Sequence, residues 1–155
     1  MNLPALGPRG EGWLVGQLLL LAAVAVSPAD GWMEPAAAIG LLGGGATILV
    51  GLAVAGRGVL DLGSNLSPFP RPKGNAVLVE RGVYRYLRHP IYAGLVLISI
   101  GLSLARGSLV GLALSLVLAV FFDLKARREE TLLAGTFSGY EAYAARTRRF
   151  IPGLY

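Results

Sequence analysis

The stretch RYLRHPIYAG, residues 85–94, holds two arginines, two tyrosines and the only histidine of the chain, and it leads directly into a long apolar run. Arginine binds carboxylates through a rigid fork of donors, and histidine changes charge near neutral pH. A second polar group, RREE at residues 127–130, follows the next apolar run. Cationic and acidic groups that meet above an apolar bundle would suit a zwitterionic ligand.

The composition indicates a membrane protein. Of the 155 residues, 54% are hydrophobic and 15% are charged, whereas soluble domains average about 25% charged residues. The net charge of +5 comes from basic residues that flank the apolar runs, which favours contact with membrane lipids over nucleic acid. Cysteine is absent, which excludes disulfides, thiol catalysis and thiolate metal sites, and we expect no metal.

Four apolar runs predict an all-α integral membrane protein with four transmembrane helices. A span takes about 20 residues, and three of the runs reach that length only with flanking aromatic or snorkelling residues. The first run could instead be a signal peptide, because Arg9 precedes it and small residues follow it. The runs are residues 13–26, 36–55, 91–105 and 108–122.

The lysines and arginines predict one orientation for all four spans. The loop 27–35 contains neither residue, the turn after the third run contains only Arg106, and the other thirteen lie near the remaining ends of the runs. By the positive-inside rule both termini are cytosolic. The alanine-, glycine-, leucine- and arginine-rich composition favours a prokaryotic protein of the cytoplasmic membrane, and the sequence leaves the oligomeric state open.

We expect a single domain in three parts. Residues 1–60 form two N-terminal transmembrane helices, residues 61–89 a cytosolic linker, and residues 90–155 a transmembrane hairpin with a cytosolic helical extension. The last apolar run continues without a helix breaker to Gly135, so one long helix extends beyond the membrane. A shorter helix is predicted at 138–149, where tyrosines and basic residues suit the membrane interface.

The hairpin brings the two polar groups together. His89 lies 18 residues before Gly107 at the turn, and Glu129 lies 22 residues after it. At about 1.5 Å per residue, both positions are roughly 27 to 33 Å from the turn. The residues around His89 and the RREE group therefore reach the same level, about one helical turn apart, and a site for a zwitterionic ligand is expected there.

Each of these residues also has a purely structural explanation. Arg88 could only satisfy the positive-inside bias, and His89 could cap a helix. The pairs Asp123–Arg127 and Lys125–Glu129 would decorate any exposed helix. Their convergence at one level is what indicates a site.

Glycine, at 22 residues, has a packing explanation as well. Gly40 and Gly44, or Gly51 and Ala55, have the small-xxx-small spacing that lets helices approach closely in lipid. The alternative for GLLGGG, at 40–45, is a phosphate-binding loop, which would need a preceding strand and polar surroundings that the sequence lacks.

Three segments in the C-terminal half, residues 82–155, resemble the isoprenylcysteine carboxyl methyltransferase family: GVYRYLRHPIYAG, REETLL and FSGYEAYAARTRRFIPG. More broadly, the chain is similar to the integral-membrane methyltransferases that include phospholipid methyltransferases. The order and spacing of the motifs make the resemblance more specific than Arg-His-Pro alone. The residues that carry it are Gly82, Tyr84, Arg88, His89, Pro90, Tyr92, Gly94, Glu129, Glu130, Leu133, Phe137, Gly139, Tyr143 and Pro152.

The resemblance implies S-adenosylmethionine as cofactor, a fold without a Rossmann domain and a cytosolic cofactor site built from the C-terminal half. For catalysis, Arg88 or Arg146, with Arg128 next, is expected to hold an acceptor carboxylate. For an amine acceptor, Glu129, Glu130 or His89 would have to serve as base. The implied cofactor-binding residues are Tyr84, His89, Pro90, Tyr92, Gly94, Glu129 and Glu130.

The implied activity is methyl transfer to a lipophilic or lipidated acceptor that arrives from the bilayer, by carboxyl (O-) methylation of an isoprenylcysteine-like substrate. Phospholipid or amine N-methylation is the alternative. Eukaryotic members tend to carry an arginine immediately before a Phe-Phe pair, where this chain has Val120. If that arginine binds the substrate carboxylate, its absence here argues against isoprenylcysteine itself as the acceptor.

Two further classes stay open. An NADPH-dependent sterol-type reductase has a similar Arg-His-Pro segment, but typically with an asparagine and an acidic residue where this chain has Ile91 and Leu95. A non-catalytic membrane scaffold could keep the fold, although the intact Glu129 and Glu130 count against it.

Overall fold

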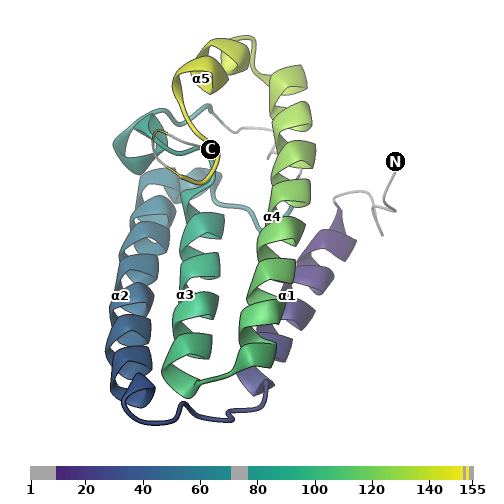
Figure 1. The fold of residues 1–155 in the computed structure, drawn as a ribbon. Coiled ribbons are helices and arrows are strands. Elements are labelled where there is room, and N and C mark those ends of the chain that lie inside the picture. The colour runs from purple at the N-terminus through teal and green to yellow at the C-terminus, as the bar shows by residue number, and fades with distance from the viewer. Residues whose placement is uncertain (1–9, 71–76, 152, 154–155) are drawn as a thin grey trace.

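The computed structural model describes residues 10–70, 77–151 and 153, and it is helical over the part described. Arg9 and Pro152, which entered the sequence analysis, lie outside these residues. Four long helices stand side by side (Figure 1). They are α1 (Glu11–Val26), α2 (Ala36–Leu62), α3 (Pro90–Arg106) and α4 (Leu109–Thr136). The short helices η1 (Gly63–Asn65) and η2 (Gly82–Arg85) lie between α2 and α3, and α5 (Tyr140–Arg146) follows α4.

The ends of α3 and α4 follow from local chemistry. Pro90 occupies the first turn of α3, where a missing N–H costs nothing. Gly107 ends the helix at a φ of 65°, which glycine adopts without steric strain. The Ser108 hydroxyl then caps α4 by accepting a hydrogen bond from the Gly111 N–H at 2.9 Å. The predicted hairpin is confirmed.

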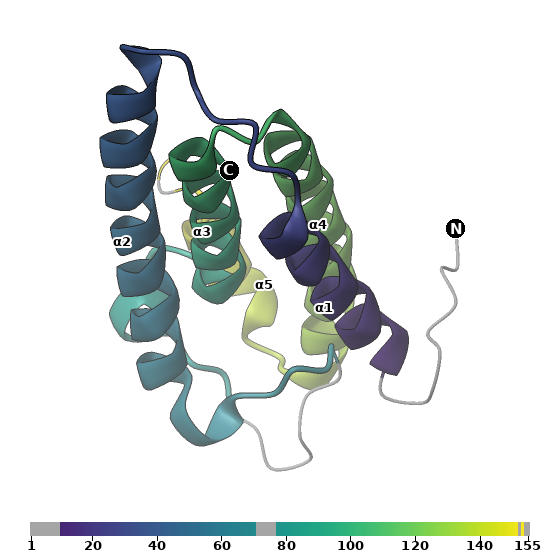
Figure 2. The same cartoon turned by 90° about the horizontal axis from the view of Figure 1, so that it is seen from below.

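The contact between α2 and α3 depends on glycine. A Cβ on Gly44 would lie 2.5 Å from the Gly101 carbonyl oxygen, and a Cβ on Gly51 would lie 2.7 Å from that of Gly94. Seen from below, α2 packs on α3, α3 on α4, and α1 on α4 (Figure 2). The predicted packing role of Gly44 and Gly51 is therefore confirmed.

Two helical segments, residues 36–65 and 109–136, are long and apolar enough to cross a membrane, while α1 and α3 are apolar but shorter. The outer surface of the bundle is apolar: Leu42 is 74% exposed and Leu60 is 73% exposed. A continuous apolar surface is unfavourable in water and favourable in lipid. A surface of this kind is typical of a helix bundle that lies in a membrane.

One end of the bundle carries α5 and η2, and we call it the α5 end (Figure 1). The helix predicted at 138–149 is shorter than expected, because α5 stops at Arg146. The next residues leave the helix and run beside the segment before α3: the Arg88 N–H donates to the Arg148 carbonyl at 2.8 Å, and the Arg148 N–H donates to the Tyr86 carbonyl at 3.0 Å.

Candidate functional site

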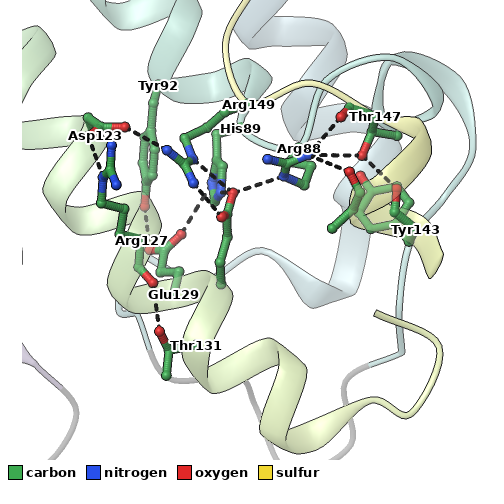
Figure 3. A network of polar contacts seen from close by, with 12 residues as sticks. Arg88, His89, Tyr92, Asp123, Arg127, Glu129, Thr131, Tyr143, Thr147 and Arg149 are labelled. Atoms are coloured by element: carbon green, nitrogen blue, oxygen red, sulfur yellow. Dashed lines mark hydrogen bonds and ion pairs between the residues drawn. The ribbon is translucent and has the colours of Figure 1, made fainter. Parts of the chain in front are cut away.

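The imidazole of His89, at the start of α3, faces two carboxylates of α4 (Figure 3). Its Nε2 lies 3.2 Å from Glu130 Oε1, and its Nδ1 lies 3.5 Å from Glu129 Oε2. These residues are 40 or more positions apart in sequence, and the hairpin geometry predicted their meeting. The convergence of the two polar groups is confirmed.

Glu130 is the centre of an ion-pair cluster. Arg88 Nε lies 2.9 Å from its Oε1, and Arg149 Nη2 lies 2.7 Å from its Oε2. Arg88 also donates through Nη1 to the carbonyls of Ala144 and Thr147, at 2.9 and 2.7 Å. The guanidinium of Arg88 is thus held between α4 and the end of α5, and this cluster fixes the position of His89.

The second carboxylate, Glu129, is held by a tyrosine. Tyr92 Oη donates to Glu129 Oε1 at 2.5 Å. The Tyr92 ring is stacked between His89, with ring centroids 5.5 Å apart, and Phe122, with centroids 4.5 Å apart. The stack fixes the phenol, and the phenol in turn fixes the carboxylate.

A cavity of about 370 Å³ opens beside this arrangement at the α5 end. Of the residues that the sequence analysis assigned to a site, Tyr84, Arg88, His89, Tyr92 and Glu129 line it. Much of the remaining wall is apolar. All five α-helices, the short helices η1 and η2 and the segments between them contribute to it. Its other lining residues are Gln17, Leu62, Asn65, Leu66, Ser67, Pro68, Phe69, Pro70, Val77, Leu78, Val79, Ile91, Lys125, Leu133, Phe137, Tyr140 and Tyr143.

The remaining assigned residues lie outside the lining of this cavity. Glu130 is turned toward its cationic partners, and Gly94 lies against Gly51 in the helix contact. Arg146 is exposed, pairs with Glu80, and stands over the Tyr143 ring at 5.7 Å. Pro90 is buried at the start of α3, and Arg128 is exposed. Val120, the position of the departure from the family pattern, is 62% exposed on the outside of α4.

A buried turn positions Tyr84 on the cavity wall. The carboxylate of Asp61 accepts a hydrogen bond from the Val83 N–H at 2.8 Å and fills the space next to Gly82. Tyr143 Oη donates to the Tyr84 carbonyl at 2.9 Å. Burial raises the pKa of both tyrosines, so both phenols stay neutral. Sequence reasoning missed Asp61, although a buried carboxylate at the end of a largely apolar helix was a usable signal.

Lys125 differs from its prediction. Asp123 and Arg127 form the expected ion pair at 2.7 Å, but Lys125 turns inward instead of pairing with Glu129. Its Nζ donates to Gln17 Oε1 at 2.8 Å and to the Pro68 carbonyl at 3.2 Å. The reason is its place on α4, on the same buried face as Phe122.

Comparison with known proteins agrees with this geometry. Residues 39–139 match the phospholipid methyltransferase family. The chain is 31% identical over 109 residues to "Protein-S-isoprenylcysteine O-methyltransferase" of Schizosaccharomyces pombe, a match that covers 68% of this chain and 46% of that protein. It is 37% identical over 81 residues to "Cobalt-zinc-cadmium resistance protein CzcN" of Cupriavidus metallidurans, covering 52% of this chain and 38% of that protein. The chain thus spans less than half the length of these relatives.

The fold matches a solved structure, that of the eukaryotic intramembrane Ras methyltransferase ICMT (isoprenylcysteine carboxyl methyltransferase), with a TM-score of 0.66 at 24% identity. The match covers 96% of this chain and 54% of that one. It confirms the fold that the motifs at 82–94 and 128–133 led us to expect. Since the family match spans more than half of the sequence, this chain belongs to the phospholipid methyltransferase family of integral membrane proteins and is similar to the isoprenylcysteine carboxyl methyltransferases.

Proposed function

We propose that this protein is an S-adenosylmethionine-dependent methyltransferase that methylates the carboxylate of a lipophilic, isoprenylcysteine-like acceptor. The observation that carries the proposal is the cavity at the α5 end, where Glu129 and His89 stand in a largely apolar wall. A small apolar cavity with a few convergent polar groups is the usual form of a cofactor site.

The residues present fit this cofactor. The cavity, about 370 Å³, lies in the range of about 300 to 1,000 Å³ that is common for small-molecule sites. Glu129 can accept a hydrogen bond from the cofactor's ammonium group beside the one from Tyr92, because a carboxylate has about four lone-pair sites. Leu66, Leu78 and Leu133 provide apolar surface for a purine.

When bound, S-adenosylmethionine supplies a methyl group made electrophilic by a cationic sulfonium. The residues of the chain align the methyl donor with the acceptor and exclude water from the reaction. The stack of His89, Tyr92 and Phe122 gives the cavity one rigid wall. A carboxylate acceptor is already a nucleophile, so no residue needs to remove a proton from it. Arg88 lines the cavity and is the better placed of the two arginines implied for the acceptor, since Arg146 is exposed beside Glu80.

A second candidate is N-methylation of a phospholipid or another amine, and the match to the phospholipid methyltransferase family favours it. An ammonium must lose a proton before it can attack. Glu129 and His89 both line the cavity and are 3.5 Å apart, so either could take that proton. Glu130 is less suited to this role, because it is held by Arg88 and Arg149.

For the membrane we propose four spans with the α5 end in the cytosol, in a prokaryotic cytoplasmic membrane. Of the four long helices, α1 and α3 are the shorter two, and they pack in the same bundle as α2 and α4. Arg85 lies in η2 and Arg81 immediately before it, at the α5 end. Arg127 and Arg128 precede Glu129, which lines the cavity at the same end, as the positive-inside rule requires. The cofactor would enter from the cytosol and the acceptor from the bilayer. Residues 61–89 would be the linker of a single domain.

Calorimetry on the purified protein in detergent tests the cofactor, with S-adenosylhomocysteine and NADPH titrated into the same preparation. We expect S-adenosylhomocysteine to bind and NADPH not to bind; the opposite result would favour a reductase, and binding of neither would favour a scaffold. Transfer of a radiolabelled methyl group to a farnesylcysteine analogue, compared with a total lipid extract, then identifies the acceptor. Base-labile label in the first acceptor indicates a carboxyl ester, and stable label in phospholipid indicates an amine.

A further inference from the structure

Lys125 is a buried basic residue on the wall of the cavity, and the methyl transfer proposed above does not use it. The side chain is 1% exposed. Its two hydrogen-bond partners, Gln17 Oε1 and the Pro68 carbonyl, are both neutral. Its Nζ also stands 5.0 Å from the centre of the Tyr92 ring. Within residues 10–70 and 77–151, Lys125 makes no ion pair at 4.0 Å or less.

Glu129 of the same helix attracts Lys125 electrostatically, but the two side chains do not form a direct ion pair. A buried charge that lacks a directly bonded counter-charge is costly. The other two basic side chains of the described cavity lining have acidic partners. Arg88 is paired with Glu130 at 2.9 Å, and His89 faces both glutamates. An ammonium has three donors, and Lys125 uses two of them on the protein. Its charge and its third donor are thus available to whatever occupies the cavity.

We propose that Lys125 binds a carboxylate of the ligand that occupies this cavity, an inference that rests on the proposed function. Glu129 follows Lys125 by one helical turn on α4 and lines the same cavity. Residues four apart on a helix are neighbours on its surface. One side of α4 therefore offers a cation and an anion to the same ligand.

Two sources could supply the carboxylate. The amino-acid part of the methyl donor carries an ammonium and a carboxylate on one carbon atom, which complements Glu129 and Lys125 together. The acceptor of a carboxyl methyltransferase also carries a carboxylate, and Lys125 would then select acidic acceptors. In both cases a carboxylate would pair with Lys125 Nζ. The two cases differ in whether the methyl donor or the acceptor binds more weakly when the charge of Lys125 is removed.

The test uses the full-length protein in detergent and the variants Lys125→Met and Lys125→Arg. The first arm measures binding of S-adenosylhomocysteine and of decarboxylated S-adenosylmethionine, which keeps the ammonium and lacks the carboxylate. If the donor is the source, Lys125→Met weakens S-adenosylhomocysteine binding at least tenfold, Lys125→Arg restores most of it, and the decarboxylated ligand binds wild type and Lys125→Met equally. The second arm measures the KM of a farnesylcysteine acceptor, which rises at least tenfold in Lys125→Met if the acceptor is the source.

Phe121→Leu is the matched structural control. Phe121 contacts Trp13 of α1 at 5.3 Å between ring centroids and does not line the cavity, so its loss loosens the packing of α1 on α4 without removing a charge. It should lower the thermal stability and leave both affinities within about twofold of wild type. If Lys125→Met does not fold, Lys125→Gln takes its place, and the wild-type preference for a ligand with a carboxylate over one without it remains measurable.

Two failures can be told apart. If wild type binds no S-adenosyl ligand, the proposed function is wrong. If wild type binds S-adenosylhomocysteine but Lys125→Met changes neither that affinity nor the acceptor KM, the inference about Lys125 is wrong while the proposed function stands.

Discussion

Arg149 Nη2 lies 2.7 Å from Glu130 Oε2, and Nη1 of the same guanidinium lies 2.9 Å from Asp123 Oδ1. One side chain from the segment after α5 therefore spans two turns of α4 (Figure 3). The His89 N–H donates to the Arg149 carbonyl at 3.1 Å, so the same residue also holds the start of α3. Arg149 joins the three chain segments that build the site.

This position predicts a stability effect for Arg149→Met. The side chain is only 14% exposed, and its loss leaves Glu130 with fewer cationic partners. Arg149 makes three hydrogen bonds to Glu130 and Asp123. Hydrogen bonds to charged groups contribute about 1.5 to 3 kcal/mol each, so the free energy of unfolding should fall by at least the contribution of one such bond. Thermal unfolding in detergent, followed by circular dichroism, measures the change.

Arg127→Met is the control for Arg149→Met, because Arg127 is 58% exposed and pairs with the same Asp123. Exposed ion pairs contribute about 0.2 to 1 kcal/mol, so this variant should change stability much less. In the double variant Arg149→Met/Glu130→Gln, the two effects should be less than additive. Full additivity would show that the two side chains do not interact.

The sequence was sufficient to predict that His89 and Glu129 lie close together. It was not sufficient to predict that Arg149 is the arginine after α5 that pairs with Glu130. The first depends on the fixed rise of a helix on both sides of a short turn, which counting residues reveals. The second depends on which arginine in RTRRF turns inward after α5 ends, and the three arginines there are chemically the same. The backbone pairing of Leu87 with Arg148 determines which of these arginines turns inward.

Lys125 shows a different limit. Its spacing of four residues from Glu129 suggested a surface pair, yet Leu118 and Phe122 on the same face are both 0% exposed. The period of apolar residues along α4 places Lys125 on that buried face, so the signal was present in the sequence.

Glu129→Gln should weaken the binding of S-adenosylhomocysteine by about 10- to 100-fold, because a charged hydrogen bond of about 1.5 to 3 kcal/mol is removed from the ligand. The amide can still accept from Tyr92 Oη, so the wall should stay in place. Calorimetry measures the affinity. Glu141→Gln on the exposed surface of α5 is the control and should bind normally. Equal affinity in Glu129→Gln and Glu141→Gln would remove Glu129 from the site.

Gly94→Ala should destabilise the contact of α3 with α2. The new Cβ would lie 2.5 Å from the Gly51 carbonyl oxygen and 2.6 Å from the Ala55 Cβ, so the helices must separate. Overpacking of this kind costs about 1 to 3 kcal/mol. Gly45→Ala is the matched control, because its Cβ meets nothing within 4 Å and alanine favours a helix over glycine by about 1 kcal/mol.

The pair also separates two roles for Gly94. If it serves packing, Gly94→Ala lowers the thermal stability, and any loss of ligand affinity disappears at low temperature, where the bundle is fully folded. If Gly94 contacts the cofactor, as the family resemblance implies, the affinity falls at every temperature. A stability equal to that of Gly45→Ala would contradict the packing role.

Gly82→Ala should be more damaging than Gly63→Ala, although both glycines have positive φ angles, 59° and 54°. The backbone strain is common to both and costs about 1 to 3 kcal/mol. At Gly82 the Cβ would also collide with the Asp61 carboxylate, whereas at Gly63 it meets nothing within 4 Å. Thermal unfolding of the two variants gives the difference. Equal losses would mean that Asp61 does not determine this turn.

Burial raises the pKa of Tyr84, Tyr140 and Tyr143 above the ordinary value, which is about 10 for tyrosine. Above about pH 10 the unfolded chain releases these protons and the folded chain keeps them. The free energy of unfolding therefore falls as the pH rises, by about 1.4 kcal/mol per pH unit for each such tyrosine. Thermal unfolding in detergent between pH 9 and about 11.5 should show this loss.

Tyr140→Phe isolates one of the three tyrosines. In the part of the chain that the structure describes, Tyr140 Oη is buried and has no hydrogen-bond partner, so its removal should not lower stability at pH 7. Above pH 10 the variant should lose stability less steeply than wild type, since one titrating group is gone. Tyr143→Phe should flatten the slope equally but cost about 1 kcal/mol at pH 7, because it removes the hydrogen bond to the Tyr84 carbonyl. A loss at pH 7 in Tyr140→Phe as large as in Tyr143→Phe would contradict the assignment of an unpaired hydroxyl.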